Sequence, residues 1–213
     1  MKDYCQENFI HNLISPQLGA KNIRQKASNS LNYYVQFILL NIFFDIKKDD
    51  NELYKKITGN SMKNIEIYKY LSPNHIIDVE ANTKREALEE MIDVICTSPK
   101  ISDKEKFSKK IFVREKLMST GIGHGIAIPH IRDDSVSDFV IALGRKKEGL
   151  KFEAIDMEPV RLIFMIGGNK SQKQEYTSLL SQLTLRLKKK KFKNKLLTAH
   201  SPEEIYKEIK SKQ

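Results

Sequence analysis

The sequence predicts an α/β domain in which a mixed central sheet is covered by helices on both faces, in three layers, with a short N-terminal extension before it. Two observations predict this fold class. Helix-start signals and β-like apolar runs alternate across roughly 150 residues, as in an interleaved α/β chain. Hydrophobic residues make up 40% of the chain and charged residues 30%, so a packed core can form.

Each element has its own signal. Capping boxes, in which Ser or Thr precedes Glu by three residues, mark three helix starts. They are Thr83 with Glu86, Ser102 with Glu105, and Ser201 with Glu204, the last with Pro202 at the first helical position. A fourth helix is predicted from apolar residues at helical spacing: Tyr176, Leu179, Leu180, Leu183 and Leu187. Short apolar runs at 76–79, 139–144 and 160–166 predict strands.

The chain divides into two unequal parts. Residues 1–61 contain no glycine motif and no paired catalytic side chains, and they end in turn-forming residues. Their apolar stretch at 31–46 shows neither a clean helical face nor strand alternation, and it is too short and too polar to span a bilayer. We therefore expect 1–61 to be an extension of unknown role and 62–213 to be the functional domain.

Composition excludes several classes of protein. The two cysteines, Cys5 and Cys96, lie far apart without metal-type spacing, which excludes a disulfide scaffold and favours a reducing cytoplasm. Nothing approaches 18 uninterrupted apolar residues, so no ordinary transmembrane helix is expected.

The net charge of +10 is concentrated in one run. Seven basic residues and no acidic one lie between Arg186 and Lys195, with Phe192 as the single aromatic residue. Nucleic-acid readers usually spread positive charge over a face and interleave aromatic residues, so we do not expect nucleic acid as a partner. We interpret the run as the end of a helix, where cations match the negative end of the helix dipole.

The chemically informative segment runs from Arg114 to Arg132. Gly121, Gly123 and Gly125 alternate there and give the backbone freedom to turn and approach a ligand. Residues 126–128 form a brief β run, and Pro129 biases Ile128 toward extended geometry, so His130 is expected at the end of a strand beside a glycine loop.

Other uses of this segment fit less well. No Gly-Lys-Ser/Thr follows the glycines, as a P-loop requires, and a helix precedes them where a dinucleotide fingerprint needs a strand. A metal site built from His124, His130, Asp133 and Asp134 lacks helical i, i+4 pairing. We expect no bound metal and no cofactor.

Several motifs in order resemble one known family. They are Arg114-Glu115, residues 119–123, residues 125–130 ending in Ile-Pro-His, residues 152–156, and Pro159-Val160. This pattern is similar to the enzyme IIA domain of the fructose, mannitol and nitrogen-regulatory type in the bacterial phosphoenolpyruvate-dependent phosphotransferase system. The similarity covers residues 62–213.

The resemblance implies specific roles. His130 would accept a phosphoryl group from a histidine-containing phosphocarrier protein and pass it to an enzyme IIB, or use its phosphorylation state to signal to regulatory target proteins. Arg114 would lie nearby and hold the phosphate, because a guanidinium matches phosphoryl oxygens in a bidentate way. Ser119, Thr120 and the backbone N–H groups of Gly121, Gly123 and Gly125 would add donors. His124 either supports His130 or is an exposed loop residue.

The sequence departs from the family pattern at two positions. Tyr176 stands where many members have a second histidine near the active one, and tyrosine does not titrate near pH 7. Met157 stands where glycine is frequent, before Pro159.

We expect a cytoplasmic phosphotransferase with a phosphohistidine intermediate, acting as a free-standing enzyme IIA of the nitrogen-regulatory type. The alternative is a sugar-specific enzyme IIA that serves a fructose- or mannitol-type permease. An alternative of another class is a non-catalytic regulatory or nucleic-acid-binding module that uses Arg186–Lys195 and the N-terminal extension.

Overall fold

The computed structural model describes residues 65–211, so the expectations for the 31–46 stretch and for the extension 1–61 lie outside the described residues. The elements in chain order are a 3₁₀ turn η1 (Ile67–Tyr70), β1 (Leu71–Asp78), α4 (Lys84–Ile95), α5 (Lys104–Leu117), β2 (Gly121–Gly123), β3 (Ile126–Ala127), β4 (His130–Arg132), β5 (Val140–Leu150), β6 (Val160–Gly168), α6 (Lys173–Lys188), α7 (Lys190–Thr198) and α8 (Pro202–Lys210).

The strands form one mixed sheet, as predicted. Its order is β1-β5-β6-β3-β2, and β4 pairs with β6 beyond β3. β1 runs parallel to β5, β5 antiparallel to β6, and both β3 and β4 run parallel to β6. The last pairing places His130 opposite Ile166.

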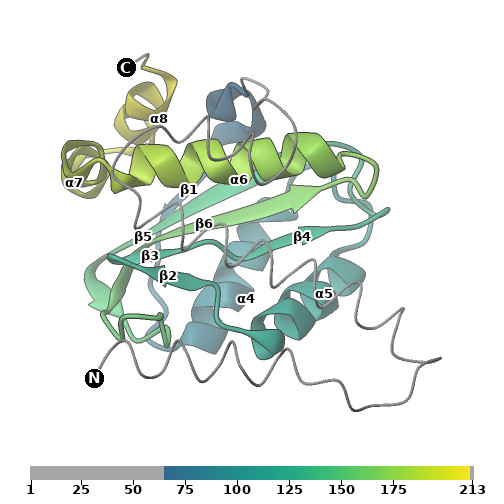
Figure 1. Ribbon diagram of the computed structural model, residues 1–213, viewed down its shortest axis with the longest axis horizontal. Coiled ribbons are helices and arrows are strands. Elements are labelled where there is room, and N and C mark those ends of the chain that lie inside the picture. The colour runs from purple at the N-terminus through teal and green to yellow at the C-terminus, as the bar shows by residue number, and fades with distance from the viewer. Residues whose placement is uncertain (1–64, 212–213) are drawn as a thin grey trace, which may run out of the picture. The chain divides into compact units, whose positions relative to one another are not determined.

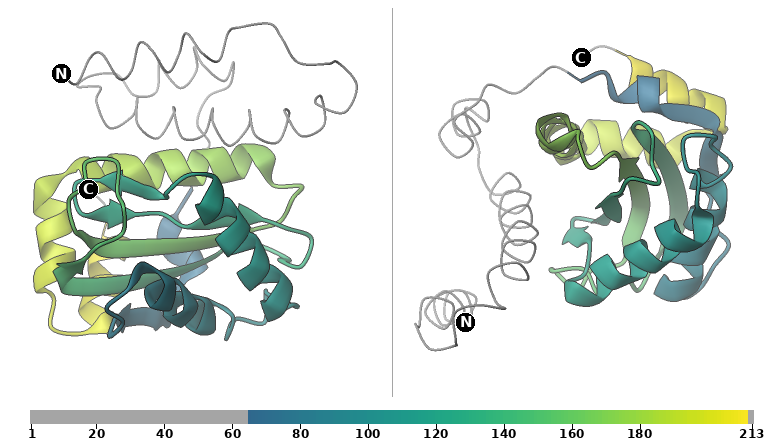
Figure 2. Two further views of the ribbon diagram at one scale, coloured as in Figure 1. Left: turned by 90° about the horizontal axis from the view of Figure 1, so that it is seen from below. Right: turned by 90° about the vertical axis from the view of Figure 1, so that its right-hand side faces the viewer.

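Helices cover both faces of the sheet, which confirms the three-layer prediction (Figures 1 and 2). Side chains alternate along β6: Leu162, Phe164 and Ile166 belong to the core beneath α6, α7 and α8, whereas Ile163 and Met165 belong to the core beneath α4 and α5. A strand buried on both faces needs apolar residues at successive positions, and from Leu162 to Ile166 the sequence is a continuous apolar run after the exposed Arg161. This explains why residues 160–166 could be recognised as a strand.

Two of the three predicted helix caps are in place and one is wrong. Thr83 and Glu86 form the complete capping box of α4, and Ser201 caps α8 ahead of Pro202. At α5 the cap is Asp103, whose carboxylate accepts the N–H of Lys106, whereas the Ser102 hydroxyl donates to the carbonyl of Ser135. A tertiary hydrogen bond therefore takes the serine that local sequence would use as the cap.

The strands extend past their predicted ends. β5 continues to Leu150 through a charged stretch that carries no apolar signal, and β6 continues to Gly168. Antiparallel pairing of these two strands holds the continuation: Arg145 lies opposite Leu162, and Leu150 opposite Val160. Backbone ladder bonds do not depend on side-chain polarity, so the sequence pattern missed this part.

The basic run does not simply end a helix. α6 ends at Lys188 and α7 begins at Lys190, so the lysines span the junction between two helices. Arg186 and Lys188 lie in the last turn of α6, as interpreted, but Lys190 and Lys191 lie in the first turn of α7, where the helix dipole disfavours cations.

Candidate active site

His130 opens β4 and is buried in the sheet rather than sitting at a loop mouth. Its side chain is 1% exposed. The carbonyl of the preceding residue, Pro129, accepts the N–H of Ile166 on β6 at 2.9 Å, which fixes the backbone at the start of the strand. The strand expected just before His130 is present as β3, and His130 itself opens a further strand, β4, which pairs with β6.

The imidazole has a defined tautomer. Its Nδ1 lies 2.5 Å from the carbonyl oxygen of Ile128. A carbonyl can only accept, so Nδ1 carries the proton and Nε2 of the neutral ring keeps its lone pair. Nε2 is buried and has no hydrogen-bond partner among residues 65–211. The nitrogen with nucleophilic character is therefore Nε2.

Burial and two arginines keep this ring neutral. Loss of solvent lowers the pKa of His130 to about 3, with further lowering from the charges of Arg114 and Arg132 and opposition from the Ile128 carbonyl. A positively charged imidazole has poor solvation and two repelling neighbours here. The neutral, nucleophilic form of His130 is thus the dominant one at physiological pH.

Arg114 lies in the last turn of α5 and is buried. Its Nη1 donates to the carbonyl oxygen of Met118 at 2.8 Å, one of the carbonyls that the helix end leaves without an intrahelical partner. This contact orients the guanidinium, and its positive charge, after burial, contributes to the lowered pKa of His130. The two residues that the sequence paired are thus brought together.

The hydroxyl candidates have internal partners. Thr120 donates both its N–H and its hydroxyl to the buried carboxylate of Glu115, the hydroxyl at 2.6 Å. Glu115 in turn pairs with Lys84 at 2.8 Å. The Ser119 hydroxyl donates to the Phe152 carbonyl at 3.2 Å and accepts the N–H of Gly121. Both side chains hold the chain between α5 and β2 in place.

The alternating glycines build a hairpin that points away from His130. β2 and β3 pair antiparallel, and the two residues between them, His124 and Gly125, have φ of 55° and 77°. Positive φ at both central positions is the type I′ pattern, which matches the twist of a hairpin. A side chain at Gly121 would collide with the backbone of Ala154, 2.7 Å from an added Cβ. The glycines therefore satisfy backbone constraints.

His124 and Gly125 lie far from His130 along the sheet. Gly125 accepts the N–H of Leu162, whereas His130 lies opposite Ile166. Four residues of one strand separate these positions, about 13 Å at 3.3 Å per residue. The exposed His124 instead donates its N–H to Asp156 at 2.7 Å. The structure thus places Gly123, His124 and Gly125 at the end of the sheet away from His130, whereas Thr120 lies nearer to it, with its carbonyl accepting the N–H of Ile128.

The sequence assigned no role to Arg132, which is also part of the site. It lies two residues after His130 on the same strand, and its guanidinium carbon lies 5.4 Å from the centre of the Tyr176 ring. Tyr176 on α6 is buried, with its ring centroid 6.0 Å from that of His130. Side chains at i and i+2 share one face of a strand, so the spacing of the two residues could have suggested this arrangement.

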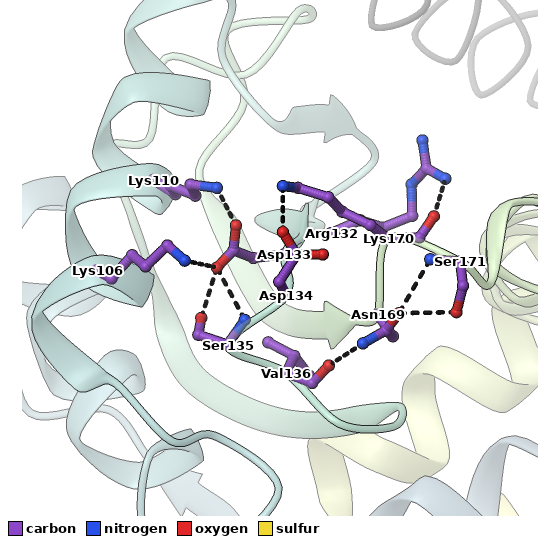
Figure 3. Close-up of polar contacts among 10 residues, drawn as sticks. All are labelled: Lys106, Lys110, Arg132, Asp133, Asp134, Ser135, Val136, Asn169, Lys170 and Ser171. Carbon is purple, nitrogen blue, oxygen red and sulfur yellow. Dashed lines mark hydrogen bonds and ion pairs between the residues drawn. The ribbon is translucent and has the colours of Figure 1, made fainter.

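A charged cluster holds the segment that follows His130 (Figure 3). Asp133 is fully buried and accepts from the N–H and hydroxyl of Ser135, and Lys106 and Lys110 of α5 both pair with it. Asp133 also donates its N–H to Gly168 at 2.9 Å. The cluster ties β4 to α5 and to the end of β6.

Two further properties concern only the residues that the structure describes. No group of three or more His, Cys, Asp or Glu side chains between 65 and 211 is arranged to hold a metal ion. No helix in the same range is long and apolar enough to cross a membrane.

The described residues form a three-layer α/β domain whose candidate site contains one buried neutral histidine, oriented by a backbone carbonyl and flanked by arginines. Comparison with known proteins gives the family. The family model described as "Phosphoenolpyruvate-dependent sugar phosphotransferase system, EIIA 2" matches residues 69–212, more than half of the chain. The chain therefore belongs to this family, as the motifs indicated.

Its relatives include both sugar-specific and regulatory proteins. A fructose-specific EIIABC component of Bacillus subtilis is 35% identical over 61% of this chain, which matches only 20% of that longer protein. A fructose-specific EIIA component of Haloferax volcanii is 31% identical over 63% of this chain and 89% of its own. The crystal structure of nitrogen regulatory protein IIA-Ntr from Neisseria meningitidis is 32% identical, with a TM-score of 0.63 over 67% of this chain and 98% of its own.

Proposed function

We propose that this protein is a phosphocarrier that accepts a phosphoryl group on Nε2 of His130. The observation that carries the proposal is the fixed tautomer: Nδ1 donates to Ile128, so Nε2 of a neutral imidazole holds the available lone pair. Arg114 supplies a positive charge beside it. Phosphoryl transfer needs positioning and charge neutralisation more than covalent machinery, and this site offers both.

The step balances as a displacement between two imidazoles. The Nε2 lone pair of His130 forms a bond to phosphorus while the phosphorus–nitrogen bond of the donor phosphohistidine breaks, and that electron pair returns to the donor ring. The His130 ring becomes more positive and keeps its Nδ1 proton, which the Ile128 carbonyl stabilises through the hydrogen bond. Arg114 offsets the charge of the phosphoryl oxygens.

The donor we propose is a small histidine-containing phosphocarrier protein, which docks at the end of α5. Val113 and Leu117, on either side of Arg114 in sequence, are exposed apolar side chains at 52% and 57%. Exposed apolar residues beside a reactive group favour a protein partner over a small substrate. Val113→Glu should slow transfer from the carrier while leaving the fold intact.

Transfer also requires a local movement, because His130 is 1% exposed. Arg132 is the side chain best placed to move. It is half-buried, it lies over Tyr176, and its Nη1 donates to the Lys170 carbonyl at a long 3.4 Å. A guanidinium released from this position can bind the incoming phosphoryl oxygens together with Arg114.

Two versions of this function differ in the acceptor. In the nitrogen-regulatory version, favoured by the similarity to IIA-Ntr over nearly all of that chain, phosphorylation changes the binding of target proteins. In the sugar-specific version, favoured by the similarity to the fructose-specific relatives, His130 passes the phosphoryl group to a cysteine of an enzyme IIB.

Labelling with phosphoenolpyruvate, enzyme I and the phosphocarrier tests the common step. The wild type should gain one phosphoryl group on His130, in a bond labile in acid and stable in base, because protonated imidazole leaves readily. His130→Gln should remain unlabelled. Labelling of that variant, or a mass shift mapped to another residue, would overturn the assignment.

Failure of the wild type to label with several carriers would favour the non-catalytic module instead. Adding enzyme IIB to the labelled protein separates the two versions: rapid loss of the label to the IIB cysteine supports the sugar-specific one, and a stable label supports the regulatory one.

A further inference from the structure

A cavity lies at the opposite end of the sheet from His130. It has a volume of about 540 Å³, within the range of small-molecule sites. Its walls come from the hairpin tip at His124 and Gly125, the start of β6, and the helices α6 and α7. Segments that are distant in sequence thus converge on one hollow that the proposed phosphoryl transfer does not use.

Four basic side chains line this cavity: Arg161 of β6, Lys188 of α6, and Lys190 and Lys193 of α7. They come from the basic run and from one strand residue that the run does not include. Within four consecutive lysines, Lys188 and Lys190 line the hollow, whereas Lys189 and Lys191 do not. The break between α6 and α7 therefore selects which lysines converge.

The acidic residues of the cavity only partly offset this charge. The lining contains two carboxylates, Asp156 and Glu158. Asp156 is engaged by the loop itself, because it accepts the N–H of His124 at 2.7 Å and the N–H of Glu158 at 3.1 Å. The cavity keeps a positive potential that an anion would relieve.

Lys193 links the helix α7 to the hairpin tip in this cavity. It is half-buried, and its Nζ donates to the carbonyl of His124 at 3.1 Å. Burial and the nearby charge of Lys190 lower the pKa of Lys193, with Asp156 opposing. In addition, α7 begins here with no acidic residue in its first turn, so its dipole adds to the positive field.

We propose that this cavity binds a small anion that carries two or more phosphate groups. Converging ammonium groups and one guanidinium are the chemistry that recognises such ligands, and a hollow walled by four segments favours a compact ligand over an extended polymer. The site is separate from His130, so the proposal does not rest on phosphoryl transfer.

Binding of pyrophosphate to the full chain, measured by calorimetry at low ionic strength, tests the proposal. The wild type should bind one pyrophosphate per chain. Lys190→Gln/Lys193→Gln should weaken binding at least tenfold. The matched control Lys189→Gln/Lys191→Gln removes the same charge from the same run outside the cavity and should change the affinity less than about twofold.

Backbone amide shifts locate the ion. Pyrophosphate should move the signals of Gly125 and Asn194, which line the cavity, and leave those of Thr120 and Ile131 near His130 in place. His130→Gln should bind as the wild type does. The proposal would be overturned by equal loss of affinity in the two double variants, by several ions bound per chain, by shifts confined to the His130 end, or by the absence of saturable binding. Equal loss in the two double variants would also identify a general attraction of polyanions such as nucleic acid.

Discussion

The rings of His130 and Tyr176 lie 6.0 Å apart between centroids, with their planes at 55°. The Phe139 ring stacks on that of Tyr176, with the centroids 6.2 Å apart. A side chain at Gly168 would collide with both rings, because an added Cβ lies 2.9 Å from Phe139 and 3.0 Å from Tyr176. α6 thus places the aromatic ring of Tyr176 beside the imidazole, at a position where many relatives are expected to have a second histidine.

Tyr176→Phe should keep the ring contact with His130, so the rate of phosphoryl acceptance should stay within about threefold of the wild-type rate. Tyr176→Ala opens a cavity beside His130 and should destabilise the fold by about 3 kcal/mol. Rapid-quench labelling and urea unfolding measure the two effects. A hundredfold slower Tyr176→Phe would mean that the hydroxyl takes part in transfer.

The lowered pKa of His130 predicts a direction for stability against pH. The unfolded chain protonates this histidine below its ordinary pKa of about 6.5, whereas the folded state, with a pKa of about 3, does not. Stability should therefore fall as pH is lowered from about 6.5 toward 3. His130→Gln should flatten this dependence.

Urea unfolding at pH 7 and pH 5 measures the change in the free energy of unfolding. The exposed His200, changed to Gln, is the matched control and should leave the wild-type slope in place. Equal slopes for wild type and His130→Gln would show that burial does not suppress protonation of His130 in the folded protein.

Arg114→Lys should slow phosphoryl transfer by roughly ten- to a thousandfold. Lysine keeps the charge but loses the planar fork, and it cannot keep the hydrogen bond to Met118 while reaching phosphoryl oxygens. Single-turnover labelling measures the rate, and thermal unfolding checks the fold. Transfer at the wild-type rate in a folded Arg114→Lys protein would exclude the clamp role.

Asp133→Asn should destabilise the protein by about 2–3 kcal/mol, because a fully buried carboxylate with two lysine partners is replaced by a neutral amide. Asp134→Asn is the control: the neighbouring, exposed carboxylate pairs with Lys170 at the surface, so its loss should change stability little. Similar losses in both variants would contradict a special role for the buried group.

The fragment 62–213 should unfold cooperatively and accept phosphate as the full chain does, if residues 1–61 are an extension. Its β1 strand, the first in the described range, begins at Leu71, well inside the fragment. Circular dichroism melting and labelling of the two proteins side by side provide the comparison. Aggregation of the fragment would place the apolar stretch 31–46 in the core.

The sequence by itself determined the elements whose signals are local. The Thr83–Glu86 box starts α4, the apolar runs become β5 and β6, and the short run before Pro129 becomes β3. A helix cap depends on residues three positions apart, and an apolar run reflects burial of the whole strand. A single chain segment is therefore enough to predict either one. The pairing of Arg114 with His130 came from family motifs rather than from spacing.

Only the tertiary structure decided which residues meet. The pairing with β6 places His124 and Gly125 near Leu162 and His130 opposite Ile166, at different ends of the sheet. In sequence, His124 and His130 are close, with only five residues between them. Packing of α6 against the sheet placed the Tyr176 ring beside His130 and Arg132, and the Ser102 hydroxyl donates to Ser135 instead of capping α5. Strand register and helix packing join segments that are distant in sequence, so no local pattern encodes them.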